Sequence, residues 1–352
     1  MEITKFDYKL PQKLIAQVPS LPRDKAKLLV FDLTSRKIFH KRFLDLGDFL
    51  KTGDVLVFNN SKVIPARLFG KKDTGGKIEV LLLRPGSKNF SFKRTWEVLL
   101  KGKIKEGQKI HFSKNFLGKI IENKGIKKII KFNKEGKELE RFIYKFGKMP
   151  IPPYIKPEIE EKKLRKYYQT WFAKIPGSVA APTAGFHFTK RLFKKLEQKG
   201  IQFEFITLHV SYPTFAPIKT EKIESFRPGK ELVIISKNTA KVLNKAKKEK
   251  RKIIAVGTTT TRALESFSKN GKILWGRKET DLFIYPGYRF KFIDGLITNF
   301  HLPRSSLILL VAAFLADKLK LKNSETLILD LYKKAIKKNY KFYSFGDGMA
   351  II

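Results

Sequence analysis

The sequence predicts an α/β protein: an α/β/α layered domain with an inserted small all-β, barrel-like domain. In the first half of the chain, short β-like runs recur at intervals of ~8–12 residues, which is typical of a small barrel or sandwich. After residue 157, helical and strand-like segments alternate, which predicts a largely parallel sheet covered by helices. A length of 352 residues with 42% hydrophobic residues is sufficient for two folded domains.

Two segments that interrupt regular structure mark the ends of the insertion. The first spans residues 59–70, and the second spans residues 147–157, with four prolines in eight residues from Pro150. Proline at this density continues neither a helix nor a central strand. We therefore assign residues 61–150 to the inserted β-barrel domain, and residues 1–60 and 151–352 to the α/β catalytic domain.

Hydrophobic runs and capping residues predict the individual elements. A helix should cover residues 138–146 and end at Gly147, as a glycine just beyond the last turn. Thr189 and Ser236 are expected to cap helices at their N-termini, and Gly200 to end the first of these. Further helices are predicted over 260–268, over 307–315 and from Ser324, and strands over 77–84, 96–100, 108–112, 117–121, 127–132, 202–210, 251–257 and 281–285.

The net charge of +42 is the most unusual feature of the composition. It indicates a polyanionic partner, with nucleic acid as the first candidate, although a lysine coat spread over the surface would give the same total. The absence of cysteine excludes disulfides, thiolate metal sites and a cysteine nucleophile. The strongly apolar run from Leu307 to Ala316 is shorter than the ~20 residues a membrane span needs. With no apolar leader in the first residues, we expect a cytoplasmic protein with no membrane contact.

The common catalytic signatures are missing from the sequence. It contains no G-x-G-x-x-G, no phosphate-binding G-x-x-x-x-G-K-[ST], no H-E-x-x-H and no G-x-S-x-G. The five histidines are too scattered to predict a metal site.

Four other segments are candidates for a functional site. Residues 178–188 are mostly small and end near His187; small side chains let a backbone approach a ligand, although a tight packing contact would use them equally. In residues 256–266 a buried strand runs into glycine and four threonines at a helix start, where anions are favoured. Residues 285–310 bring amide, imidazole, guanidinium and hydroxyl groups to one loop. Residues 59–67 place two amides and Arg67 at the entry to the insertion, where clefts are common.

Together these segments resemble one family, the S-adenosylmethionine:tRNA ribosyltransferase-isomerases of queuosine biosynthesis. The resemblance runs in order across nearly the whole chain. The similar stretches are residues 57–70, 76–83, 149–155, 168–173, 176–189, 207–210, 256–266, 283–314 and 340–351.

The resemblance implies a reaction and its partners. The ribosyl moiety of S-adenosylmethionine would be transferred and rearranged onto 7-aminomethyl-7-deazaguanine at the wobble position of a tRNA, giving epoxyqueuosine-tRNA, adenine and methionine. It implies S-adenosylmethionine as co-substrate and no resident cofactor, and nothing in the sequence indicates a metal site. We expect a monomer that binds tRNA.

The resemblance and the chemistry together nominate site residues. We expect acid/base roles for His187 and His301 and a catalytic role for Glu231. Thr258 to Arg262, with Arg304, should contact the methionine or ribose part. The expected substrate-binding residues are Asn59, Asn60, Arg67, Thr183, Gly185, His209, Thr258, Thr259, Thr260, Arg262, Tyr285, Asn299, Arg304 and Ser305.

This chain departs from the family pattern between residues 205 and 231. Ser211 and Pro213 stand where the family usually has glycines, and Phe226 and Gly229 stand where it tends to have histidines ahead of Glu231. These departures fit a family in which those histidines are not essential, and they also fit a divergent member with altered substrate handling or lost activity. We expect a working enzyme, because the other segments are nearly intact. Two other functions stay open: another S-adenosylmethionine-dependent tRNA enzyme, such as a methyltransferase, and a non-catalytic RNA-binding relative.

Overall fold

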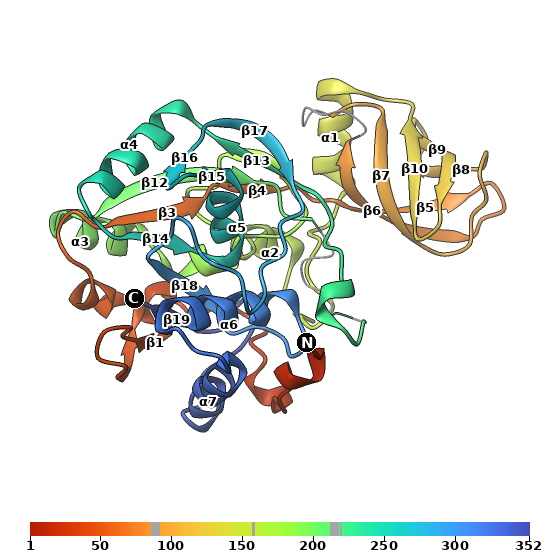
Figure 1. Cartoon of the computed structure of the whole chain (residues 1–352). Helices are drawn as coiled ribbons and strands as arrows, with labels where there is room; N and C mark the ends of the chain where they lie inside the picture. Colours follow the sequence, from red (N-terminus) through yellow and green to blue (C-terminus); the bar gives the residue numbers. More distant parts are fainter. Residues whose placement is uncertain (86–91, 157–158, 212–217, 219) are drawn as a thin grey trace.

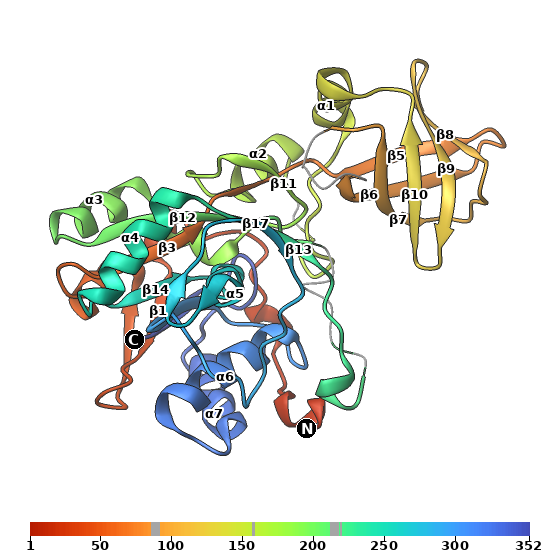
Figure 2. The ribbon, with the colours of Figure 1, turned by 45° about the horizontal axis from the view of Figure 1, so that its top comes forward.

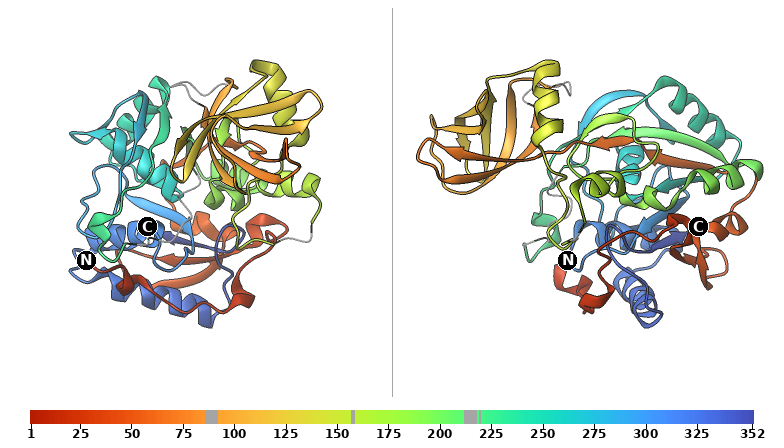
Figure 3. Two further views of the ribbon diagram at one scale, coloured as in Figure 1. Left: turned by 90° about the vertical axis from the view of Figure 1, so that its right-hand side faces the viewer. Right: turned by 180° about the vertical axis from the view of Figure 1, so that it is seen from behind.

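The computed structural model describes residues 1–85, 92–156, 159–211, 218 and 220–352. Figure 1 shows an α/β domain built from both ends of the chain, with a β-barrel projecting from one side of it. Figures 2 and 3 show from other directions that the barrel stands beside the α/β domain and is not part of its sheet.

A nine-stranded sheet forms the centre of the α/β domain, in the order β17-β13-β12-β3-β14-β18-β19-β1-β2. The strands are β1 (Lys27–Phe31), β2 (Ile38–Arg42), β3 (Val55–Asn59), β12 (Gln202–Leu208), β13 (Glu231–Ile235), β14 (Ile253–Val256), β17 (Gly276–Thr280), β18 (Gly295–Asn299) and β19 (Gly348–Ile351). Parallel pairing runs from β12 through β3 and β14 to β18 and recurs between β19 and β1. The remaining pairings are antiparallel. The sheet is therefore mixed, and the expectation of a largely parallel sheet is right only for its centre. Hairpins need no crossover helix, so the edges can be antiparallel.

Alternate residues of β3 pack on opposite faces of the sheet. Val55 and Val57 belong to the core under the helices α4 (Lys237–Lys248), α5 (Thr258–Phe267), α6 (Ser306–Leu319) and α7 (Ser324–Lys337). Leu56 and Phe58 join a second core with α3 (Lys190–Gln198) and the 3-10 helix η4 (Phe43–Phe49). A strand buried on both faces is hydrophobic at every position, which explains this uninterrupted run. The predicted α/β/α layering is confirmed.

The barrel closes in the order β10-β7-β6-β5-β8-β9, with β9 paired to β10. All five strands predicted between residues 77 and 132 are confirmed, and β5 adds a sixth. The helix α1 (Gly136–Phe146) contributes Leu139 and Ile143 to the barrel core beside Trp96. The barrel strands are β5 (Arg67–Lys72), β6 (Lys77–Pro85), β7 (Thr95–Lys101), β8 (Lys109–Ser113), β9 (Phe116–Lys124) and β10 (Lys127–Phe132).

The chain enters and leaves the barrel side by side. The backbones of Arg67 and Lys148 exchange two hydrogen bonds, of 3.1 and 2.8 Å. Gly147 follows α1 as predicted, but its φ of −71° is not the left-handed conformation of a glycine cap. A Cβ at this position would lie 2.0 Å from the carbonyl oxygen of Pro65. Gly147 is therefore required by the close approach of two backbone segments.

The capping predictions are confirmed. The Thr189 hydroxyl accepts a hydrogen bond from the backbone of Leu192 at 3.2 Å, and the Ser236 hydroxyl accepts one from Thr239 at 3.0 Å. The remaining short elements are α2 (Glu161–Tyr167), β4 (Ser61–Val63), β11 (Ile175–Ser178), β15 (Ser268–Lys269) and β16 (Lys272–Ile273). In the ranges that the structure describes, no helix combines the length and apolar character needed to cross a membrane.

The strand predicted over residues 281–285 is wrong, since β17 ends at Thr280. The carbonyl of Leu282 accepts a hydrogen bond from the guanidinium of Arg262 at 2.9 Å. Ile284 is buried in the core of the domain. The apolar pattern of this segment therefore reflects packing against the core and not membership of a sheet.

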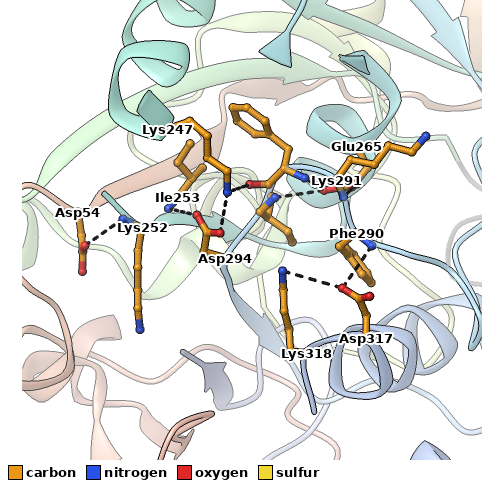
Figure 4. Close-up of polar contacts among 12 residues, drawn as sticks. Asp54, Lys247, Lys252, Ile253, Glu265, Phe290, Lys291, Asp294, Asp317 and Lys318 are labelled. Atoms are coloured by element: carbon orange, nitrogen blue, oxygen red, sulfur yellow. Dashed lines mark hydrogen bonds and ion pairs between the residues drawn. The ribbon is translucent and has the colours of Figure 1, made fainter. Parts of the chain in front are cut away.

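Carboxylate side chains stabilise the loop between residue 285 and β18. The backbone N–H groups of Lys291, Phe292 and Ile293 donate to the buried Glu265 at 2.8, 3.0 and 3.2 Å. Figure 4 shows Glu265 with Lys291, and nearby Asp294, which pairs with Lys247 at 2.6 Å. These contacts fix the loop that leads into β18.

Candidate active site

Polar side chains gather in a pocket at the carboxyl ends of β14 and β18. Its walls come mainly from residues 181–184, 257–259, 298–302 and 343–344, with Tyr154 from the linker after the barrel. In open α/β sheets, ligands bind outside the carboxyl ends of the strands. We call this cavity the first pocket.

The helix α5 points its N-terminus at the first pocket. Gly257 joins β14 to this helix with a φ of +94°, a conformation that favours glycine. Thr258 and Thr259 line the pocket beside the first amides of the helix, where partial positive charge favours an anion. The hydroxyls of Thr260 and Thr261 donate to carbonyls one turn earlier, at 2.8 and 3.2 Å. Only the first two threonines are therefore available to a ligand.

Asn299 is held in a fixed orientation on the pocket wall. Its Oδ1 accepts a hydrogen bond from the Thr183 hydroxyl at 2.8 Å, and its Nδ2 donates to the Asp347 carbonyl at 3.3 Å. The same Nδ2 lies 3.4 Å from Nε2 of His187, whose ring stacks on Phe43 with centroids 4.0 Å apart. His187 is thus placed behind Asn299 and is not among the residues that line the pocket. Burial lowers the pKa of His187 to about 3, so its ring is neutral at pH 7.

His301 lies on the wall of the first pocket. Its Nε2 is 2.9 Å from the Thr298 hydroxyl, and its backbone N–H donates to the Tyr332 hydroxyl at 3.0 Å. Burial lowers the pKa of His301 to about 3, so this imidazole is also neutral at pH 7. Within the described ranges, the other ring nitrogen has no protein partner. The site therefore presents a neutral imidazole that can accept a proton or a hydrogen bond.

Glu231 and Arg262 form a buried ion pair in a second pocket, which shares Leu307 with the first. Glu231 also accepts hydrogen bonds from the backbone and the hydroxyl of Ser211, at 2.9 and 3.2 Å. The Arg262 guanidinium donates in addition to the carbonyl of Leu282 at 2.9 Å. Glu231, which the sequence assigned to catalysis, and Arg262, which it assigned to substrate binding, are thus partners in one ion pair.

A cleft between the barrel and the α/β domain contains His209. Burial lowers the pKa of this histidine to about 4. Across the cleft, Arg84 of β6 pairs with Glu97 at 3.4 Å and with Glu279 of β17 at 3.1 Å. The second contact joins the two domains directly.

Two of the remaining expected residues stabilise the elements around the pocket. Asn59, at the end of β3, donates to the Leu208 carbonyl at 2.9 Å and reaches the Thr259 hydroxyl at 3.4 Å. Asn60 accepts a hydrogen bond from Thr207 at 2.7 Å. These amides hold β3 to β12 and support the start of α5.

The other expected residues lie outside both pockets. Arg67 of β5 pairs with Glu79 of β6 at 2.9 Å within the barrel, Arg304 pairs with Asp7, and the Ser305 hydroxyl caps α6. The ring of Tyr285 packs on Phe283, with centroids 5.0 Å apart. A Cβ on Gly185 would lie 3.0 Å from side-chain atoms of both Thr170 and Phe172, so this glycine serves packing.

Three pocket residues were not anticipated. The Tyr154 hydroxyl lies 2.8 Å from the Ser344 hydroxyl, and the ring of Tyr154 packs 4.8 Å from that of Tyr343. Tyr343 has a φ of +70°, which is unusual for a residue other than glycine. These residues lie in segments 149–155 and 340–351, which resemble the family but contain no recognisable site motif. The sequence therefore offered no reason to place them in the pocket. Among the described side chains, His, Asp and Glu do not gather in a group of three or more that could hold a metal.

A polar pocket at the carboxyl ends of parallel strands, beside a cleft to a second domain, is the ligand site typical of an α/β protein. The chain belongs to the queuosine biosynthesis protein family, whose model matches residues 3–351. Proteins from Sulfurihydrogenibium sp. and Aquifex aeolicus, both named S-adenosylmethionine:tRNA ribosyltransferase-isomerase, are 46% identical over 100% of this chain and of their own. The crystal structure of S-adenosylmethionine tRNA ribosyltransferase from Thermotoga maritima is 32% identical, with a TM-score of 0.55, over 99% of this chain and 100% of its own.

Proposed function

We propose that this protein transfers the ribosyl moiety of S-adenosylmethionine to 7-aminomethyl-7-deazaguanine at the wobble position of a tRNA. The sugar is isomerised in the reaction, which yields epoxyqueuosine-tRNA and releases adenine and methionine. The observation that carries the proposal is the first pocket, where the N-terminus of α5 and a neutral His301 face one cavity. The family membership supports the same reaction.

The two ends of S-adenosylmethionine need different groups. The methionine carboxylate suits the amides and hydroxyls of Thr258 and Thr259, because a helix N-terminus favours an anion. The carbon next to the sulfonium must lose a proton, and the departing adenine must gain a proton or a hydrogen bond. We assign the first task to His301, because its ring is neutral at pH 7 and one ring nitrogen can accept a proton. His187 positions Asn299 and takes no proton from the substrate.

A labelling experiment tests this function against the alternatives. Precursor tRNA is incubated with S-adenosylmethionine labelled in the ribose and, separately, in the methyl group. Ribose label in the tRNA with free adenine supports the proposal, whereas methyl label indicates a methyltransferase. Binding of tRNA with neither label indicates a non-catalytic relative.

Replacing His301 tests its assigned role. His301→Asn keeps a hydrogen-bonding side chain but removes the imidazole, and we expect adenine release to fall by ~100-fold or more, the usual contribution of a general base. Lys241→Glu, on the exposed side of α4, serves as the control with unchanged turnover. Near-normal turnover in His301→Asn would exclude the histidine as base.

A further inference from the structure

The second pocket holds a guanidinium nitrogen that the protein does not satisfy. Glu231 is 2% exposed and Arg262 is 8% exposed. Nη1 of Arg262 bonds to Glu231 and Nε bonds to Leu282, whereas Nη2 is buried and, in the part of the chain that the structure describes, lacks a hydrogen-bond partner. A buried donor without an acceptor is costly, so an acceptor from outside the protein is expected at Nη2.

The walls of this pocket are mainly aromatic and apolar. The ring centroids of Phe226 and Phe283 lie 5.1 Å apart with the ring planes at 63°, and Leu307 and Leu310 add apolar surface. Aromatic and apolar walls receive an unstacked base, and a donor beside a carboxylate reads its edge. A phosphate is a poor fit, because Glu231 would repel it.

The second pocket opens toward the cleft between the domains. Ser211, Gly229 and Glu231 line both the pocket and the cleft, which has a volume of about 470 Å³. Lys124 and Lys127 of the barrel and Lys230 of the α/β domain lie along the cleft. Basic side chains there attract a polyanionic backbone and hold it next to the pocket.

We propose that Glu231 and Arg262 read the edge of the tRNA base that is modified, after it swings out of the anticodon loop and enters the second pocket through the cleft. This inference rests on the proposed function. Nη2 of Arg262 donates to the ring carbonyl of the deazaguanine, and Glu231 accepts from the neighbouring ring N–H. Leu307 separates this base from the first pocket, so the base and S-adenosylmethionine lie side by side.

Adenine presents the reverse order, with an amino donor where the deazaguanine has its carbonyl, so in the same orientation its edge does not match Arg262 and Glu231. The connection to the cleft supports the same choice. A base that is still part of an RNA must enter from a surface that accommodates the RNA backbone. The cleft is such a surface, and the second pocket shares three lining residues with it.

The double variant Glu231→Gln/Arg262→Gln tests the reading of the base. Changing both residues avoids leaving one charge buried alone. We measure Kd for an anticodon stem–loop RNA with the aminomethyl-deazaguanine, for the same RNA with adenine at that position, and for S-adenosylmethionine. The unmodified protein should prefer the first RNA by ~5- to 100-fold, the range expected for one base-edge contact. The double variant should lose this preference and keep its affinity for S-adenosylmethionine.

Two results would overturn the inference. In the first, the double variant keeps the preference for the RNA with the deazaguanine. In the second, the double variant loses affinity for S-adenosylmethionine instead, which would place the adenosyl group in the second pocket. Because these are binding measurements, they stand apart from the labelling experiment. Absence of ribose transfer by the unmodified protein refutes the proposed function without removing the base preference.

Two surface variants test whether the RNA reaches the second pocket through the cleft. Both leave Glu231 and Arg262 unchanged, so the result does not depend on how the double variant folds. Lys230→Glu changes an exposed lysine at the cleft, and Lys241→Glu makes the same change on α4, outside it. Lys230→Glu should weaken RNA binding and reduce the slope of log K against log salt by about 1. Equal effects of the two variants would exclude the cleft as the path of the RNA.

Discussion

The hydrogen bond from Thr183 to Asn299 provides a sharp test of the first pocket. At 2.8 Å it is the shortest contact of the Asn299 amide, whose bonds to Asp347 and His187 are 3.3 and 3.4 Å long. Thr183→Val keeps the shape of the side chain and removes only the donor. The Asn299 amide would then be free to rotate on the pocket wall.

The expected loss follows from the energy of one hydrogen bond. A neutral hydrogen bond contributes about 0.5–1.5 kcal/mol, and an acceptor left partly unsatisfied adds to this, so we expect a total of about 1–2 kcal/mol. This corresponds to a ~5- to 30-fold lower kcat/KM, measured as adenine release from S-adenosylmethionine in the presence of tRNA. The midpoint of thermal unfolding should change by only a few degrees.

Thr183→Ser is the matched control, because it keeps the hydroxyl and loses only the methyl group. We expect its kcat/KM to stay within ~2-fold of the unmodified protein, since the donor to Asn299 is preserved. Full activity in Thr183→Val would refute the reasoning. So would equal damage in both variants, because packing of the methyl group would then matter and not the hydrogen bond.

Three further predictions concern stability. Glu265→Ala leaves three backbone N–H groups without their acceptor and should cost about 3–6 kcal/mol in urea unfolding, whereas Glu265→Gln retains an acceptor and should cost about half as much; equal costs would contradict this account. Gly147→Ala should destabilise the barrel or its junction in thermal unfolding, because the new Cβ would lie 2.0 Å from the carbonyl oxygen of Pro65; an unchanged midpoint would show that the junction relaxes freely. Burial lowers the pKa of His187 and of His301 to about 3, so the unfolded chain binds more protons below its own histidine pKa of about 6.5. Stability should therefore be complete above about pH 6.5 and fall as the pH is lowered toward 3, and a flat profile of unfolding free energy in that window would argue against neutral buried rings.

Sequence signals were reliable where contacts between residues close together in the chain decide the local structure. Thr189 and Ser236 cap their helices because a side-chain oxygen and an amide three residues later always lie within reach at a helix start. The barrel strands were found because short β-like runs recur at intervals of ~8–12 residues and are separated by turns. The segment over 281–285 shows the limit of this reasoning. A short apolar run shows that the segment packs against the core, but only a neighbouring strand makes it part of a sheet.

The sequence by itself determined the family, the layered fold, the inserted barrel and the segments that form the site. Only the tertiary structure decided which residues meet, because those contacts join positions far apart in the chain. Thr183 bonds to Asn299, and Glu231 pairs with Arg262, through strand order that no local pattern encodes. Burial likewise made His187 a support for Asn299 and left His301 on the pocket wall, since the degree to which a side chain is removed from water depends on the whole fold around it.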